Sequence, residues 1–268
     1  MQRKAGMITT DFRPGAPCWI ELNTPDVPVS SEFYRKIFGW ATAPIEPVEA
    51  GYLMFSKDRR AVGAVGPLDH EQQRTAWTLF FTVTDVHRAV EDTERFGGIV
   101  LVEPFDIGED GRMAYFIDPQ GGVFGVWEPR NFSGFAAVDE PDTFGWADLW
   151  TPDALGAQTF YRALLGWESE NLPLPLQASE YILVRPEGTD RERAHGGLMG
   201  VTSELLEATE GAASWQPSFM VVDCDVGVDL VKEGGGQVHS GPEDVPMEAR
   251  IAFCSDPLGA EFVLLEST

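Results

Sequence analysis

The stretch Ser31–Trp40, SEFYRKIFGW, returns later in the same chain as Gln158–Trp167, QTFYRALLGW. Each copy contains Phe-Tyr-Arg, three further residues that end on an apolar one, and Gly-Trp. The same offset of 127 residues (160 − 33) relates a tryptophan and a Thr-Pro-Asp sequence upstream of each copy: Trp19 to Trp146, and Thr24 to Thr151. An internal repeat of this length indicates that the chain is a tandem duplication.

A second register relates the rest of the two copies. An offset of 138 residues (215 − 77) pairs Trp77 with Trp215, Gly97 with Gly235, Arg112 with Arg250, Asp118 with Asp256, and Gly121 with Gly259. Eleven additional residues (138 − 127) therefore lie before Trp215, and we expect them in the polar stretches PEGTDRERAH and TSELLEATEGAAS, because insertions belong in loops. We predict two homologous domains, residues 17–130 and 145–268, joined by a linker at residues 131–144.

Each half contains the same series of elements twice. CWIELNTPD alternates apolar and polar residues, as a half-buried strand does, and Pro25-Asp26 then opens a helix. Val29, Phe33, Ile37 and Phe38 follow at helical spacing, and Gly39 ends the helix. Of these residues, Phe33, Ile37 and Phe38 are expected to pack the helix onto its own sheet. Three strands follow, and the series begins again at Trp77 and ends with a tight D-P-x-G turn before the last strand. The prediction is an α+β fold of four βαβββ modules.

This order of elements resembles the vicinal oxygen chelate superfamily, which includes glyoxalases, ring-cleaving dioxygenases and bleomycin-type resistance proteins. The motifs F-Y-x-x-[IL]-[FL]-G-W and D-P-x-G carry the resemblance, which spans nearly the whole chain. Through PCWIELNTPD, FDIGEDGRM and GVFGVWEP it is greatest to tandem glyoxalase-like proteins of actinobacteria, often labelled hydroxylases or culture-filtrate antigens. The resemblance implies two tandem glyoxalase-like domains and, because such relatives occur beside aromatic polyketide antibiotic pathways, a role in antibiotic biosynthesis.

The resemblance also implies positions for a divalent metal, on the first and last strands of the modules. Carried onto this sequence, they fall at Trp19, Thr78 and Gly125 in the first half and at Trp146, Gln216 and Val263 in the second. These side chains do not form a His and carboxylate ligand set, and a shift of one or two residues does not restore one. The four histidines, His70, His87, His195 and His239, have no ligand spacing and are expected to be solvated or packed. We predict no metal and no other cofactor.

Alternation along the strands predicts what replaces the metal. The expected ligand-binding residues are Trp19, Thr78, Phe80 and Trp127 in the first half, and Trp146, Trp150, Gln216 and Ser218 in the second. Indole and phenyl rings suit a flat, mostly apolar ligand. The expected catalytic residues are the carboxylates Glu21, Asp148 and Glu261, because burial can raise the pKa of a carboxyl group and make it a general base.

A structural role is the alternative for each of these residues. The tryptophans can fill an abandoned cavity as core packing, and Glu21 and Asp148 can serve as hydrogen-bond partners. Arg112 and Arg250, at matching places in the repeat, are expected to pair with acids rather than bind a substrate anion.

The composition of the chain limits the classes of molecule that the protein is expected to bind. The chain has 43 acidic and 19 basic residues and a formal net charge of −24, so it repels nucleic acid and anionic bilayers. Its three cysteines lack disulfide or zinc spacing, and no apolar stretch is long enough to span a membrane. We expect a soluble cytoplasmic protein, monomeric or homodimeric, whose partner is a small hydrophobic or aromatic molecule.

Three hypotheses for function follow. The first is a metal-independent enzyme that transforms a bulky aromatic or polyketide-like molecule by proton transfer, through hydration, dehydration, cyclisation or rearrangement. The second is a non-catalytic protein that sequesters an antibiotic or metabolite. The third is a hydroxylase, an oxygenase or a glyoxalase-like lyase with a degenerate site.

Overall fold

The structure is a computed structural model that describes residues 8–68, 74–172, 180–245 and 249–267. The first sheet contains β1 (Pro17–Thr24), β2 (Ala41–Pro44), β3 (Leu53–Lys57), β4 (Arg60–Pro67), β5 (Ala76–Thr82), β6 (Ile99–Ile107), β7 (Gly111–Ile117) and β8 (Val123–Pro129). The second contains β9 (Phe144–Thr151), β10 (Glu168–Leu172), β11 (Glu180–Arg185), β12 (Gly196–Gly200), β13 (Ser214–Met220), β14 (Gln237–Val245), β15 (Ala249–Ser255) and β16 (Glu261–Ser267).

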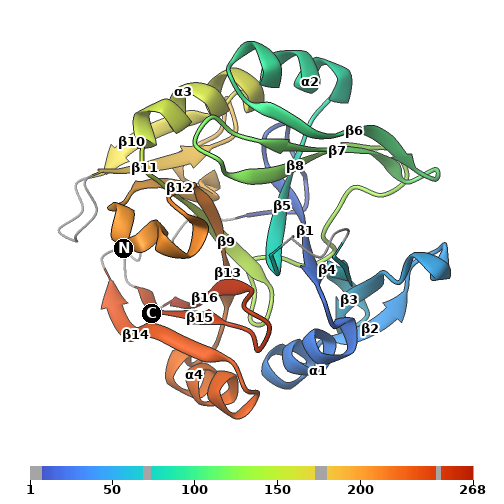
Figure 1. Cartoon of the computed structure of the whole chain (residues 1–268), viewed down its shortest axis with the longest axis vertical. Coiled ribbons are helices and arrows are strands. Elements are labelled where there is room, and N and C mark those ends of the chain that lie inside the picture. The colour runs from blue at the N-terminus through green and yellow to red at the C-terminus, as the bar shows by residue number, and fades with distance from the viewer. Residues whose placement is uncertain (1–7, 69–73, 173–179, 246–248, 268) are drawn as a thin grey trace.

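The two sheets have the same topology (Figure 1). The strand order is β2-β3-β4-β1-β5-β8-β7-β6 in the first sheet and β10-β11-β12-β9-β13-β16-β15-β14 in the second. In each sheet the first strands of the two modules pair antiparallel, β1 with β5 and β9 with β13. Each first strand also pairs parallel with a later strand of its own module, as β1 does with β4. The predicted α+β fold of βαβββ modules is confirmed.

Within the described residues, four α-helices connect the first and second strands of the modules: α1 (Val27–Phe38), α2 (Val86–Arg95), α3 (Ala154–Leu165) and α4 (Cys224–Glu233). Short 3-10 turns lie at Val48–Ala50, Arg191–Arg193 and Ser203–Thr209. An aspartate caps the start of every α-helix by accepting backbone N–H groups of the first turn, as Asp26 does from Val29. Gly39 and Gly166 end α1 and α3 in the left-handed conformation, at φ 68° and 70°.

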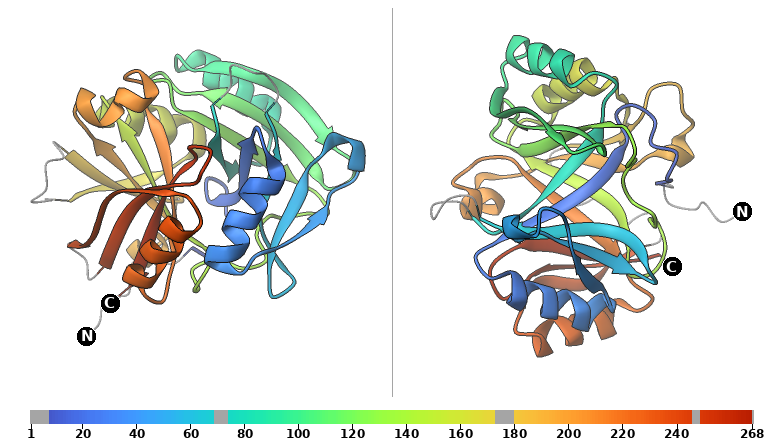
Figure 2. Two further views of the ribbon diagram at one scale, coloured as in Figure 1. Left: turned by 60° about the horizontal axis from the view of Figure 1, so that its bottom comes forward. Right: turned by 90° about the vertical axis from the view of Figure 1, so that its right-hand side faces the viewer.

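The repeated Phe-Tyr-Arg motif joins the two halves. α1 packs beside α4, and α3 packs beside α2 (Figures 1 and 2). The ring of Phe33 lies against the backbone at Gly236 in the second half, and its mirror residue Phe160 lies against Gly98 in the first. The prediction that Phe33 packs α1 onto its own sheet is therefore wrong, and Val29, expected in the same apolar stripe, is exposed.

The Gly-Trp pair that ends each copy also reaches across. The indole N–H of Trp40 donates to the carbonyl oxygen of Asp142, just before β9, at 2.7 Å. In mirror image, Trp167 donates to the carbonyl oxygen of Gly15, just before β1, at 2.7 Å. Each half therefore anchors the chain that enters the other half's first strand.

The D-P-x-G turns contribute to the same interface. Asp118 accepts a hydrogen bond from the hydroxyl of Tyr161 in the second half at 2.9 Å. Asp256 accepts one from Ser30 in the first half at 3.3 Å. Burial raises the pKa of both carboxyl groups. These turns are thus interface contacts as well as chain reversals.

Among the described residues, no helix has both the length and the apolar character needed to cross a membrane. The cysteines Cys18, Cys224 and Cys254 are buried free thiols, and removal from water raises the pKa of each to about 12.

Candidate functional site

Each sheet has one face covered by its own helices and an opposite face, which we call the open face. Leu264 lies against Gly227 in α4, so the next residue back, Val263, is on the open face of the second sheet. Trp77 donates a hydrogen bond to Tyr34 in α1, so Thr78 is on the open face of the first sheet. Cross-strand pairing then places the predicted site residues of each half on its open face.

Asp148, on the open face of the second half, is held by three hydrogen bonds. Its Oδ1 accepts hydrogen bonds from the hydroxyl of Tyr181 at 2.7 Å and from the indole N–H of Trp146 at 3.1 Å. The backbone of Gly197 contributes a further hydrogen bond. Burial raises the pKa of Asp148 to about 6, although all three hydrogen bonds act in the opposite direction. The Asp148 side chain is only partly exposed to solvent.

Polar side chains continue from Asp148 onto the neighbouring strands. Gln216 pairs directly with Asp148 across β9 and β13, and its amide donates to Glu261 Oε2 on β16 at 3.1 Å. Ser218 pairs with Trp146 one step along and is buried. The predicted residues Asp148, Gln216 and Glu261 therefore occupy one level of three adjacent strands.

Aromatic rings flank this polar level in the second half. The rings of Trp146 and Tyr181 lie at one end, with their polar atoms 3.2 Å apart. Trp150 packs against Phe253 with ring centroids 5.1 Å apart, and both side chains are partly exposed. The arrangement provides stacking surfaces beside a carboxyl group that can exchange a proton near neutral pH.

The open face of the first half is arranged differently. Glu21 is buried and its Oε1 accepts hydrogen bonds from Tyr115 at 2.9 Å and from Asn23 at 3.4 Å. The ring of Phe80 fills the space over Gly125, where a Cβ atom would lie 2.2 Å from it. Gly125 is one of the positions that the resemblance to the superfamily implies for a metal, and the ring of Phe80 covers it.

Linker residues cover part of the same face. Phe132 and Phe135 lie over Trp19, with centroids 5.1 and 5.5 Å from its ring. Trp127 donates its indole N–H to the carbonyl oxygen of Phe132 at 2.9 Å. Trp19 and Trp127 thus serve as packing residues for the linker.

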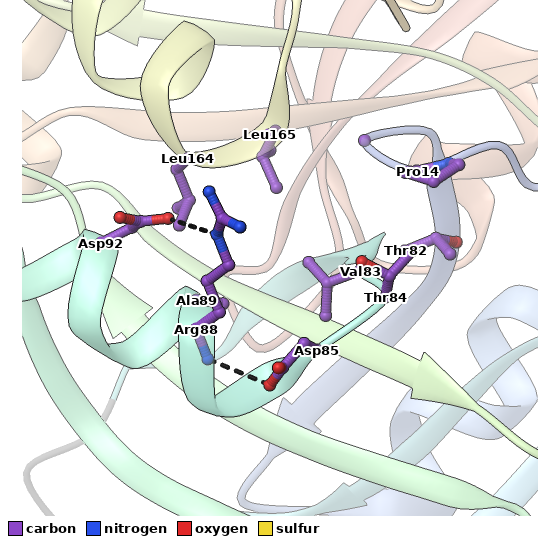
Figure 3. A pocket seen from close by; sticks show the side chains of 11 residues that line it. Pro14, Thr82, Val83, Thr84, Asp85, Arg88, Ala89, Asp92, Leu164 and Leu165 are labelled. Carbon is purple, nitrogen blue, oxygen red and sulfur yellow. Dashed lines mark hydrogen bonds and ion pairs between the residues drawn. The ribbon is translucent and has the colours of Figure 1, made fainter.

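Two hollows lie outside the open faces. One, of about 150 Å³, lies between the start of α2 and the end of α3 (Figure 3). Arg88 in its wall pairs with Asp92 at 3.5 Å, and the backbone N–H of Arg88 donates to Asp85 at 3.1 Å. The other, of about 460 Å³, is a groove between α1 and α4. Neither is lined by any residue predicted for the site.

Comparison with known proteins identifies the family. The model of the Glyoxalase/Bleomycin resistance protein/Dioxygenase superfamily matches residues 18–125. The anthracycline biosynthesis protein DauV of Streptomyces sp. (strain C5) is 35% identical, over 96% of this chain and 95% of DauV. This chain belongs to the vicinal oxygen chelate superfamily, as that superfamily is also known. The anthracycline biosynthesis protein DnrV of Streptomyces peucetius is 34% identical, over 96% of this chain and 95% of DnrV.

A solved vicinal oxygen chelate protein shows the same fold. The 2,3-dioxygenase LapB from Pseudomonas sp. KL28 matches with a TM-score of 0.66 over 96% of this chain and 93% of LapB, at 15% sequence identity. The recognition of the superfamily from the sequence is confirmed, as is its relation to proteins of antibiotic biosynthesis.

The described residues at the carried-over positions do not fit the superfamily's divalent metal. Within the described residues, no three His, Cys, Asp or Glu side chains gather into a group that could hold a metal ion. Of the carried-over positions in the second half, Trp146 and Val263 lie at one level with Ser218 between them, whereas Gln216 lies one step along, opposite Asp148. None of the side chains at the carried-over positions is a metal ligand of the usual kind.

Histidine and arginine positions complete the comparison with the sequence predictions. His195 is buried against Trp167 at a centroid distance of 5.1 Å, and neither ring nitrogen has a hydrogen-bond partner in the part of the chain that the structure describes. Burial lowers the pKa of His195 to about 3. Arg112 pairs with Asp106 at 2.7 Å and Arg250 with Asp225 at 2.9 Å, as expected for structural ion pairs. His70 lies outside the described residues.

The sequence missed the tyrosines that hold the two carboxylates. Tyr115 and Tyr181 stand on strands that do not pair with β1 or β9, so alternation along those first strands says nothing about them. The sequence indicates them in one way only. Each tyrosine lies in a strand at a position where the alternation of side chains places it on the open face.

Proposed function

We propose that this protein binds a flat, polycyclic aromatic molecule of polyketide type and transforms it by proton transfer without a divalent metal, by hydration, dehydration, cyclisation or rearrangement. The observation that carries the proposal is Asp148, whose raised pKa of about 6 lies close to neutrality within an aromatic surface. A group with such a pKa exchanges protons efficiently under physiological conditions.

The hydrogen bonds of Asp148 fit this role. Tyr181 and Trp146 both donate to Oδ1, so two side chains hold the carboxyl group in place beside the aromatic rings. Trp150 and Phe253 offer ring faces near the same strand level for an aromatic ligand. The relatives support the substrate class, because DauV and DnrV are named for anthracycline biosynthesis and anthracyclines are polycyclic aromatic polyketides.

Binding and metal content test this proposal. We expect 1,4-dihydroxyanthraquinone to quench the tryptophan fluorescence of the purified protein saturably, with no stoichiometric divalent metal in the protein. Asp148→Asn should keep the binding and lose the titration near pH 6 in any activity found. A tightly bound metal whose removal abolishes activity would contradict the proposal. Ligands that bind tightly and are always recovered unchanged would favour sequestration instead.

A further inference from the structure

One level of the second sheet is polar across five strands. It begins at Asp148 on β9 and continues through Gln216 on β13 to Glu261 on β16, which pairs with Ser255 on β15. At the outer end, His239 on β14 makes a hydrogen bond to the Ser255 hydroxyl at 3.0 Å. His239 is exposed, whereas Gln216 and Ser255 are buried. We call these five residues the polar row.

The same level of the first sheet is apolar beyond its first two strands. At 138 positions before Gln216, Glu261, Ser255 and His239 stand Thr78, Val123, Ile117 and Leu101. Val123 and Leu101 are exposed, and Ile117 is partly exposed. An exposed position needs no particular polarity for folding, so folding alone does not explain why one copy carries carboxylate, hydroxyl and imidazole groups where the other carries hydrocarbon.

A second observation points to a ligand beside the polar row. Trp150 lies on the same face as Asp148, and its indole N–H is buried without a hydrogen-bond partner in the described structure. An unpaired buried donor destabilises the folded protein, and an acceptor atom on a bound molecule would remove that cost. Among the described residues, no other indole N–H is buried without a partner, and on the first half's open face Trp127 donates its indole N–H to Phe132.

We propose that the open face of the second half alone carries the reaction, with Glu261 accepting a proton from the substrate while Asp148 donates one to the substrate's other end. This inference rests on the proposed function and adds the place, the second carboxyl group and the reaction class. Gln216 is the positioning residue, because its amide holds Glu261 from one side.

The spacing suits a conjugated ring system. β13 separates β9 from β16, and neighbouring strands lie about 4.8 Å apart, so the two carboxylate-bearing strands are about 10 Å apart. That separation spans fused aromatic rings lying across Gln216. A substrate placed there has one carboxyl group at each end.

The step is an isomerisation, and it balances without an oxidant or reductant. The Glu261 carboxylate takes a proton from a C–H or O–H group, and that bond's electron pair shifts through the conjugated system. The far end takes the proton of the Asp148 carboxylic acid. Glu261 then releases its proton to solvent past Ser255 and His239, and Asp148 takes one from water. The substrate has gained and lost one proton.

Hydrogen exchange at carbon tests the proposal with a defined probe. We expect the wild-type protein to accelerate the exchange of the C1 hydrogens of 2-tetralone in D₂O, followed by proton NMR. Glu261→Gln should slow the catalysed exchange about 100-fold or more, the scale of general acid–base catalysis. Glu261→Val, which imports the first half's residue, should do the same. Val123→Gln puts the same amide at the mirror position and should leave exchange unchanged.

Gln216→Thr imports the residue of Thr78 and tests positioning. A lost positioning contact should move the pH profile of exchange, whereas a purely structural role would lower the rate equally at all pH values. Melting temperatures of each variant report whether it folds.

The outcomes separate this inference from the proposed function. If the wild-type protein does not bind 1,4-dihydroxyanthraquinone, the proposed function fails. If it binds the quinone but shows no exchange, or if folded Glu261→Gln keeps full exchange, the two-carboxyl site is overturned while binding stands. Loss of exchange in Glu21→Gln together with normal exchange in Glu261→Gln would place the reaction in the first half and overturn the inference.

Discussion

The tryptophan and phenylalanine contacts between the two halves are alike in mirror image, whereas the open faces of the two halves differ. Trp40 and Trp167 make the same hydrogen bond in mirror image, and Phe33 and Phe160 pack against corresponding glycines. On the open faces, by contrast, Val123 stands where the second half has Glu261. The duplication therefore kept the contacts that hold the halves together and changed the surface that can meet a ligand.

Small differences also exist inside the interface. Val62 and His195 occupy equivalent places, each two residues before the residue of β4 or β12 that pairs with the open-face carboxylate. Both are buried. The valine carries no polar side-chain atom, whereas the ring nitrogens of the histidine have no hydrogen-bond partner among the described residues.

The largest expected effect is on the shared contacts. Trp40→Ala and Trp167→Ala should each lower the free energy of unfolding by about 3–5 kcal/mol, because each removes a buried indole and its hydrogen bond across the interface. Urea denaturation measures both, and Trp40→Phe and Trp167→Phe separate the loss of the hydrogen bond from the loss of volume. If only one of the two alanine substitutions lowered the free energy of unfolding, the two tryptophans would not contribute equally to the stability of the interface.

The two motif tyrosines should differ. Tyr161 accepts from Trp215 at 3.2 Å and donates to Asp118, whereas Tyr34 accepts from Trp77 at 3.0 Å and makes no hydrogen bond to Asp256, which Ser30 reaches instead. Tyr161→Phe should therefore cost about 2–3 kcal/mol and Tyr34→Phe about 1 kcal/mol. Equal costs would mean that the bond to Asp118 contributes nothing.

His195 should make the protein sensitive to acid. Its pKa is about 3 in the folded protein against 6.5 as the ordinary value, so below pH 6.5 the unfolded chain takes up a proton that the folded chain refuses. Stability is then lost as the pH falls, by about 2 kcal/mol between pH 7.5 and pH 5. His195→Val should remove this loss, and Val62→His should add a similar one. Chemical denaturation at the two pH values measures both.

Asp148 should change the pH dependence of stability in the opposite direction to His195, and by a smaller amount. Its pKa is raised to about 6 in the folded protein from the ordinary 3.8, so its stabilising contribution is present at low pH and is lost as the pH rises through 6. Asp148→Asn should gain about 1–2 kcal/mol of stability relative to wild type between pH 4 and pH 8, with allowance for the partial exposure of this carboxyl group. A constant difference across that range would show an ordinary surface carboxylate.

The sequence predicts the fold well because the two copies of the repeat share the residues that start and end the helices. Gly39 and Gly166 must adopt a left-handed conformation, and the aspartate caps must start the helices, so both copies keep them. The same repetition does not say which half a side chain touches. For that reason Phe33 was assigned to its own sheet, although it packs on the other.

The candidate site is only partly predictable for a different reason. Alternation places Asp148, Gln216 and Glu261 on one face because β9, β13 and β16 are regular at this level. The register of β14 shifts between Val238 and Ser240. Side chains therefore do not alternate regularly between the two faces of this strand, and the sequence alone does not show that His239 reaches Ser255. The catalytic and ligand-binding roles of the site residues stay predictions.

The crossed indole bonds have a consequence for how the protein unfolds. Because Trp40 anchors the entry to β9 and Trp167 anchors the entry to β1, neither half retains its complete set of contacts when the other is lost. Thermal melting should therefore be a single cooperative transition rather than two. In a cooperative unit, the contacts of both halves contribute to one free energy of unfolding. Destabilising substitutions on one open face can therefore accumulate while the other half helps to keep the whole chain folded.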